Sequence, residues 1–217
     1  MLIWKVIALK RIASLLSAWL IAEGKLGDEQ AAVVAYGAMT AVNTVTTTLL
    51  LGIAAWVTNL GPLLAVAALT GASLRVLTGG AHYTSPWRCS LASAAAYLGM
   101  AFGAMQMGIA SPAALGMAGA VVWAAGTVVI WRFAPTDTKA YPLPEAKRQR
   151  LRRLSLAYSA FVAILWSVAL AQGVNPVLLA AALLAYGWQL FTVTPAGFTV
   201  IRTVDQGLLS LGIGGEA

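Results

Sequence analysis

The sequence is poor in charge, cysteine and histidine, and each shortage excludes a class of protein. Only 10% of its 217 residues are charged, whereas 60% are hydrophobic. A soluble domain of this length would need far more charge to cover its surface. The single cysteine excludes an internal disulfide, and one cysteine with one histidine is too few for a usual zinc site. No metal or other cofactor is therefore expected.

The charge that is present is mostly basic, with 14 Lys and Arg against 7 Asp and Glu. A basic excess can indicate a nucleic-acid partner. Here the charges lie between apolar blocks that must sit in lipid. We therefore expect a polytopic membrane protein whose surroundings are membrane lipids and which has no nucleic-acid partner.

Long charge-free runs define the predicted architecture. Residues 31–74, 90–131 and 154–201 contain no Asp, Glu, Lys or Arg, and each run is about twice the ~20 residues that one spanning helix needs. Each has a turn signal near its middle, TNLGP at 58–62, GIASP at 108–112 and QGVNP at 172–176. The prediction is one all-α membrane domain over 1–217, with three hairpins that make six transmembrane helices between residues 31 and 194. The expected spans are 31–57, 62–79, 90–109, 112–132, 154–172 and 176–194.

The ends of the chain are predicted to lie outside this six-helix core. Residues 1–28 read as an amphipathic helix on the membrane surface, with Lys10 and Arg11 on one side and apolar side chains such as Trp19 on the other. The alternative is a loosely attached leader. The basic residues interrupt the apolar stretch, so a signal peptide is not expected. Residues 195–217 are predicted to be a tail.

The distribution of basic residues predicts the orientation. All 14 Lys and Arg fall outside the three hairpin turns. The positive-inside rule then places both termini, the 75–89 loop and the 132–153 loop in the cytoplasm.

The 75–89 loop contains His82 and Cys89, the only histidine and the only cysteine in the chain. A lone cysteine is commonly a small buried hydrophobe, and a lone histidine is commonly structural. Their occurrence together in one short loop, flanked by Arg75 and Arg88, instead favours a Cys–His nucleophile pair.

The local sequence indicates how such a pair could form. Residues seven apart in an unbroken helix stand roughly 10.5 Å apart along the axis, but Pro86 makes a continuous helix unfavourable. Ser85 suits the N-cap and Pro86 the first helical position, which puts Cys89 in the first turn. The helix dipole and the Arg88 charge would favour its thiolate. Gly80 and its neighbour give the chain freedom to bring His82 over the thiol.

The 132–153 loop is the second informative stretch, because prolines at 135, 142 and 144 prevent a regular helix there. Asp137 either caps a turn or orients His82. The basic block at 147–153 either anchors the next helix to anionic lipid or docks an acidic partner. Its members are Lys147, Arg148, Arg150, Arg152 and Arg153.

At these two loops the sequence resembles the AgrB family of bacterial quorum-sensing endopeptidases. The first loop matches as R-x4-G-x-H-x6-C, formed by Arg75, Gly80, His82 and Cys89. The second, APTDTK with Pro142 after it, resembles the family's loop after the fourth transmembrane helix. The amphipathic N-terminus and the six-helix plan also agree.

That resemblance implies a function in the bacterial cytoplasmic membrane. Cys89 would attack an AgrD-like precursor peptide, with His82 as general base and then acid. A thioester acyl-enzyme would form, and a thiolactone or lactone ring would close without ATP. Arg75 and Gly80 would support the loop, and the basic block and Lys139 would bind an acidic precursor tail. The family also suggests a homodimer.

Two other classes of function compete with this interpretation. The first is a non-catalytic membrane peptide exporter; the absence of charge deep in the predicted helices argues only against a charge-coupled carrier. The second is a scaffold whose Cys89 is lipidated. A scaffold would have no need of His82.

The orientation can be tested with reporter fusions. Fusions at residues 60, 110 and 174 should report the outside of the cell, and fusions at 84, 142 and 217 the inside, because every basic residue lies on the second side. An external location for residue 84 would separate the candidate site from a cytoplasmic precursor and would contradict the mechanism.

Overall fold

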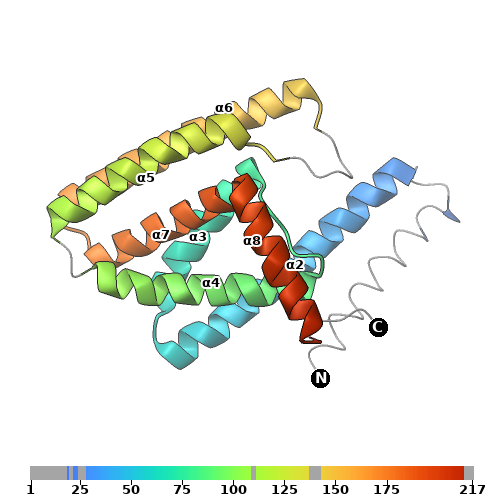
Figure 1. Ribbon diagram of the computed structural model, residues 1–217, viewed down its shortest axis with the longest axis horizontal. Coiled ribbons are helices and arrows are strands. Elements are labelled where there is room, and N and C mark those ends of the chain that lie inside the picture. The colour runs from blue at the N-terminus through green and yellow to red at the C-terminus, as the bar shows by residue number, and fades with distance from the viewer. Residues whose placement is uncertain (1–18, 20–21, 24–27, 109–110, 137–142, 213–217) are drawn as a thin grey trace.

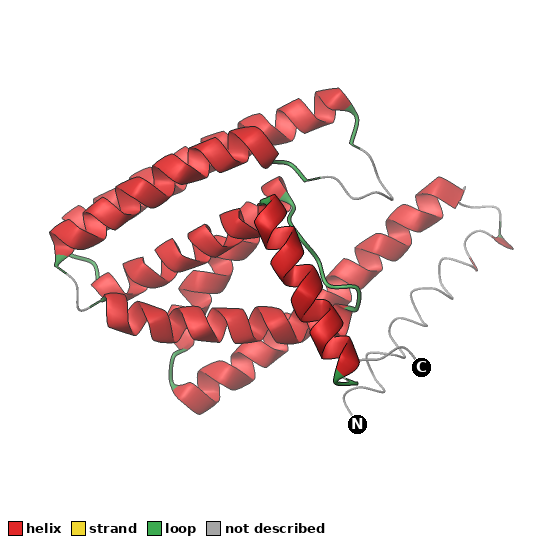
Figure 2. Ribbon diagram, in the orientation of Figure 1, coloured by secondary structure: helices red, strands yellow, loops and turns green. Residues whose placement is uncertain are grey.

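The computed structural model describes residues 19, 22–23, 28–108, 111–136 and 143–212. These form helices joined by short connections, as Figure 2 shows, so the predicted all-α class is confirmed in the described part of the chain. The helices are α2 (Asp28–Thr58), α3 (Gly61–Thr78), α4 (Pro86–Met107), α5 (Pro112–Phe133), α6 (Glu145–Ala171), α7 (Pro176–Val193) and α8 (Pro195–Ser210). Nearly all of the predicted surface helix at 1–28 lies outside the described residues.

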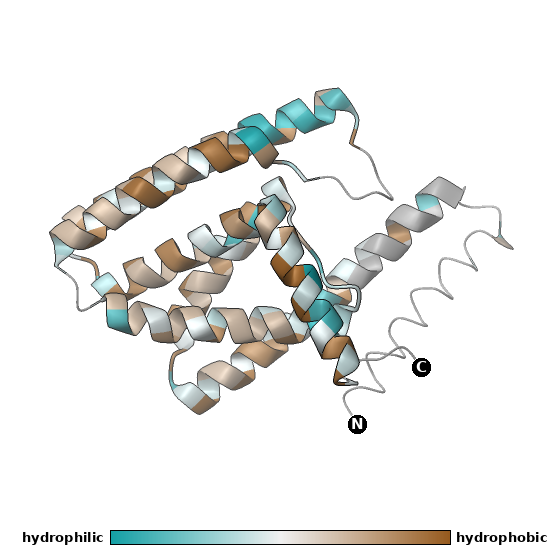
Figure 3. Ribbon diagram, in the orientation of Figure 1, coloured by the Kyte–Doolittle hydropathy of each residue, from teal (hydrophilic) through white to brown (hydrophobic). Residues whose placement is uncertain are grey.

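Five helices are long and apolar enough to cross a membrane: α2 over Thr40–Thr58, α3, α5, α6 and α7. In Figure 3 the coloured ribbon of these helices is mostly white to brown, apart from the hydrophilic start of α6. The sixth expected span corresponds to α4, which has 22 residues but is rich in Ala, Ser and Gly and is therefore less apolar. The chain is an integral membrane protein, and the count of six spans stays a prediction.

Proline marks the start of most helices. Ser111 accepts a hydrogen bond from the Ala114 N–H before Pro112, and Asn175 accepts one from the Val177 N–H before Pro176. Such caps satisfy N–H groups that have no partner within the helix. The predicted helix starts at 112 and 176 agree with the structure, because a capping side chain followed by proline favours a helix start at that position.

The helices pack mainly with partners that are not their neighbours in sequence. Helix α3 packs on α7, α2 on α4, and α4 and α5 also on α7, while α5 and α6 lie side by side (Figure 1). The turn signals thus located the connections without determining the packing. Helix α7 is the most buried of the candidate spans, and the other helices of the core surround it.

Close helix contacts depend on small residues and a few polar groups. A Cβ on Gly126 of α5 would lie 2.5 Å from the Tyr186 hydroxyl of α7, so the two helices approach closely at this glycine. The Trp166 indole N–H donates to the Leu179 carbonyl at 2.9 Å and joins α6 to α7. Small residues and interhelical hydrogen bonds are how membrane helices associate without a hydrophobic driving force.

Two parts of the prediction differ from the structure. Residues 145–153 belong to α6, so the whole basic block lies in the first turns of a helix and not in a loop. Helix α8 occupies most of the predicted tail, and its hydropathy is too mixed for a membrane span (Figure 3). Helix α8 was therefore not predicted, because the sequence prediction relied on long apolar runs.

Candidate functional site

The loop that contains His82 runs between the end of α3 and the start of α4, and other segments hold it in place. The Ala81 N–H donates to the Thr192 carbonyl at the end of α7, at 2.9 Å. The Thr136 N–H, just after α5, donates to the Thr78 carbonyl at 3.0 Å. The ends of α3, α5 and α7 and the start of α4 therefore meet at one end of the bundle.

Two glycines allow this close assembly. Gly79 and Gly80 have φ angles of 69° and 143°, which residues with a side chain rarely adopt. A Cβ on Gly80 would lie 2.7 Å from the Thr192 hydroxyl and 3.2 Å from Nη1 of Arg75. Gly80 was predicted to support the loop, and the geometry gives a reason: any side chain there would displace α7 or Arg75.

Arg75 projects from the last turn of α3 to the loop. Its Nη2 donates to the Ala81 carbonyl at 2.6 Å and lies 3.1 Å from Nδ1 of His82. Nδ1 of a neutral imidazole can accept this hydrogen bond only if the ring proton is on Nε2. Arg75 therefore holds the loop backbone at Ala81 and lies within hydrogen-bond distance of the His82 ring.

The same contacts lower the pKa of His82. Surrounding protein removes water from part of the ring, and the Arg75 charge adds repulsion, so the pKa falls from 6.5 to about 4. The residue as a whole remains exposed to solvent. At neutral pH the imidazole is uncharged and able to accept a proton.

Cys89 lies in the first turn of α4, as predicted. Its N–H donates to the carbonyl of the N-cap residue Ser85 at 3.0 Å, but the Ser85 side chain makes no capping bond. The thiol is buried beside a cavity of about 30 Å³. The cavity is lined by Arg75, Ala81, Tyr83, Cys89, Ala92, Ser93, Ala96, Trp188, Thr192 and Ile201. It has room for water-sized molecules only, so a peptide has to approach the thiol from the open side.

His82 and Cys89 share one loop region without being in contact. In the part of the chain that the structure describes, no hydrogen bond joins the thiol to the imidazole, and the ring lies against Arg75 instead. Catalytic hydrogen bonds are often long in the absence of substrate. Proton transfer between the two groups requires His82 to turn from Arg75 toward Cys89.

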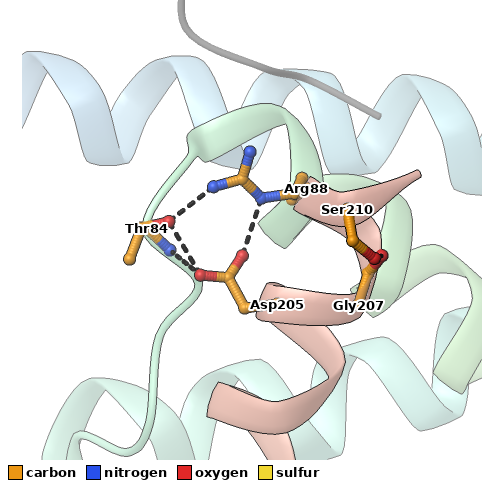
Figure 4. A network of polar contacts seen from close by, with 5 residues as sticks. All are labelled: Thr84, Arg88, Asp205, Gly207 and Ser210. Atoms are coloured by element: carbon orange, nitrogen blue, oxygen red, sulfur yellow. Dashed lines mark hydrogen bonds and ion pairs between the residues drawn. The ribbon is translucent and has the colours of Figure 1, made fainter. Parts of the chain in front are cut away.

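Arg88 differs from its predicted role next to the thiol. Its side chain is 2% exposed, and Nε donates to Oδ1 of Asp205 in α8 at 2.7 Å, as Figure 4 shows. The positive charge is therefore paired with a carboxylate. Its expected effect on the Cys89 thiolate is offset by Asp205.

Gln189 and Asp205 also hold the site together, although no local sequence pattern pointed to either residue. Gln189 donates to the Gly79 carbonyl at 2.7 Å, and Asp205 binds Thr84 and Arg88. One signal was present: Thr194 precedes Pro195 just as Ser85 precedes Pro86, and its hydroxyl accepts from the Gly197 N–H. That signal predicts a further helix in the segment that contains Asp205.

The basic residues of α6 divide into two groups. Arg152 is half-buried and donates to the Ala134 carbonyl at the end of α5, at 2.9 Å, and Arg148 pairs with Glu145. Lys147, Arg150 and Arg153 are exposed. The other two candidates from this region, Asp137 and Lys139, lie outside the described residues. No three His, Cys, Asp or Glu side chains gather as a metal site within the described ranges.

Comparison with known proteins gives a family. The family model Accessory gene regulator B, or AgrB, matches residues 10–193. AgrB-like protein 2 of Clostridium perfringens (strain 13 / Type A) is 24% identical over 213 residues, which is 91% of this chain and 97% of the relative. No solved structure matches the chain.

The contact between Arg75 and His82 predicts a shift in titration. Arg75→Gln removes the neighbouring charge, so the pKa of His82 should rise toward 6.5. The histidine is the only one in the chain, so NMR of its ring reports it alone. If neutral His82 is the base, activity is lost as pH falls through this pKa, and the acid limb of cleavage should move to higher pH in the variant. Arg202→Gln, at an exposed position of α8, is the control; an equal titration in both variants would contradict the interpretation.

Proposed function

Because the chain belongs to the AgrB family, we propose that it is a membrane cysteine endopeptidase that processes an AgrD-like precursor peptide. The match over residues 10–193 carries the proposal, since it includes both informative loops and the helices that hold them. The contacts of Arg75 with the His82 ring and with the loop backbone support it further. Three of the four residues of the R-x4-G-x-H-x6-C pattern thus form one connected group.

The proposed first step is acyl transfer to Cys89. His82 takes the thiol proton, and the thiolate sulfur attacks the carbonyl carbon of the scissile peptide bond. As the tetrahedral intermediate collapses, the C–N bond breaks and His82 returns the proton to the leaving amine. The acidic C-terminal fragment departs, and the N-terminal fragment remains on Cys89 as a thioester.

The second step closes the ring. A cysteine thiol or serine hydroxyl within the bound fragment loses its proton to His82 and attacks the thioester carbonyl. The bond to Cys89 breaks, the sulfur regains the proton, and a thiolactone or lactone leaves. A thioester retains much of the energy of an activated acyl group, so the exchange needs no ATP.

The start of α4 suits the developing negative charge on the carbonyl oxygen. The Ser85 side chain does not cap this turn, which leaves the Trp87 N–H directed out of the helix start. An N–H group and the helix dipole at this position stabilise an oxyanion. Trp87 and Cys89 belong to the same turn, so the oxygen of an attacked carbonyl would lie near this donor.

The proposal also includes the surroundings of the site. Both termini and the loop with His82 face the cytoplasm of a bacterial cell, where a precursor would be made. The exposed basic residues of α6 bind the acidic tail of that precursor or anionic lipid. The contact of Thr136 with Thr78 and that of Arg152 with Ala134 support a position of this basic segment at the same end of the bundle as the loop. The active form is proposed to be a homodimer.

The acyl-enzyme provides the direct test of the chemistry. A precursor whose ring-forming Cys is changed to Ala should leave a mass increase on Cys89 that hydroxylamine removes, because hydroxylamine cleaves thioesters. Cys89→Ala should bind precursor and leave it uncut. His82→Ala should lower the cleavage rate by roughly 10²–10⁴-fold, the usual contribution of a general acid–base, with partial recovery at high pH.

Normal cleavage by Cys89→Ala, with no adduct on the wild-type protein, would return the cysteine to a structural role. Transport of intact precursor by that variant would then favour the exporter. A long-chain acyl thioester on Cys89 in place of the precursor fragment would favour the lipidated scaffold.

The exposed basic residues can be separated from the buried ones. Neutralising Lys147, Arg150 and Arg153 to Gln should raise KM for an acidic-tailed precursor with little change in kcat, and high salt should weaken the effect. A precursor with a neutral tail is the control. Equal effects on both precursors would mean that the segment only anchors α6 to lipid. Arg152→Gln should instead disturb folding, because it removes the bond to Ala134.

A further inference from the structure

A buried polar network joins α8 to the loop between α3 and α4. The Asp205 carboxylate is almost fully enclosed, and the residue is only 4% exposed. Its Oδ1 accepts from Nε of Arg88 at 2.7 Å, and its Oδ2 accepts from the Thr84 N–H at 3.1 Å and the Thr84 hydroxyl at 2.7 Å (Figure 4). Arg88 also donates to the Thr84 hydroxyl, which closes the network.

The position of this network along the chain matters more than its size. Thr84 is two residues after His82, and Arg88 is one residue before Cys89. One carboxylate on a distant helix therefore holds both ends of the segment that connects the proposed base to the proposed nucleophile.

The carboxylate also determines the charge near the thiol. Burial alone would raise the pKa of Asp205, but the hydrogen bonds from Arg88 and Thr84 outweigh it and lower the pKa, so the group is ionised at neutral pH. It then balances the buried Arg88 guanidinium. Removing one partner of a buried pair leaves the other as an uncompensated charge.

We propose that Asp205 is a positioning residue for catalysis, which through Thr84 and Arg88 sets the relative placement of His82 and Cys89. This inference rests on the proposed function of those two residues. Asp205 does not touch the reacting atoms. It acts by fixing the loop through Thr84 and the first turn of α4 through Arg88.

Several ionisable groups surround Cys89, and the test has to account for them. Tyr83 from the loop and Arg75 from α3 line the cavity with the thiol. Tyr97 lies further along α4, and Asp205 faces the loop from α8. Arg88, next to Cys89 in the chain, pairs with Asp205. Among all these groups the single variants below change Asp205 alone, and the double variant changes Asp205 and Arg88. A change in the titration of Cys89 would therefore follow from the Asp205–Arg88 pair.

The first measurement needs no precursor. Cys89 is the only cysteine, so its alkylation by iodoacetamide as a function of pH reports one thiol. Asp205→Asn removes one buried negative charge from the network beside Cys89, so the midpoint of alkylation should move to lower pH by at least half a unit. Asp205→Glu should restore the midpoint. Gln206→Ala, at the neighbouring exposed position of α8, should alkylate as wild type does.

The second measurement is cleavage of an AgrD-like precursor that the wild-type protein cuts. Asp205→Asn should lower kcat by about 10- to 100-fold, the effect of a misplacement near 1 Å, with little change in KM. The loss of rate would occur although the thiol ionises more readily, a combination that neither unfolding nor simple electrostatics produces. Gln206→Ala should cleave normally.

A double variant keeps the inference testable if Asp205→Asn alone does not fold. Arg88→Gln with Asp205→Asn removes both charges. Its alkylation midpoint should stay near that of wild type while kcat still falls, because the fixed geometry is lost. Cleavage by Asp205→Asn within twofold of wild type, or an unmoved midpoint with an intact protein, would overturn the inference. Cleavage by Cys89→Ala in the same assay would instead overturn the proposed function, so the two failures are distinguishable.

Discussion

The side-chain amide of Gln189 bonds to the chain where helix α3 ends. Nε2 of Gln189 donates to the Thr78 hydroxyl at 3.0 Å and to the Gly79 carbonyl at 2.7 Å. A backbone that leaves a helix inside a membrane bundle has no water to satisfy its polar groups, so another helix must supply the partners. Because Gly79 is fixed, Gly80 can pass close to Thr192, and Arg75 can reach both the Ala81 carbonyl and His82. The candidate site is built from these contacts outward.

The two arginines beside the loop do different work because their surroundings differ. Arg88 is buried, and its positive charge forms an ion pair with Asp205. Among the described residues no acidic side chain pairs with Arg75, and its charge acts on the imidazole. A guanidinium can hold two geometrically separate acceptors at once. The result is one arginine that anchors a helix and another that adjusts a histidine.

The parts of the fold that the sequence predicts are those with local causes. Pro86 sets the start of α4 through its fixed φ, and at the start of α7 the fixed φ of Pro176 is joined by a side-chain cap from Asn175. The R-x4-G-x-H-x6-C pattern located the candidate site for the same reason, since its residues are close in sequence. What could not be predicted depends on distant contacts: the packing of α4 and α5 on α7, and the buried pair of Arg88 with Asp205, 117 residues apart. Helix α8 was predictable only in part. Thr194 and Pro195 marked its start, but its mixture of apolar and charged residues did not show which side chains are buried.

The narrow cavity beside Cys89 sets a size limit for covalent inhibitors. Along α4 its wall is made of Ala92, Ser93 and Ala96, one helical turn after another, and Trp188 of α7 lines it as well. At about 30 Å³ it leaves no room for a branched or aromatic group behind the sulfur. A selective compound would therefore combine a slim, unbranched electrophile with recognition elements that remain outside, near Arg75 and Tyr83. A bulky thiol reagent would have to reach the single cysteine from the same open side as a peptide.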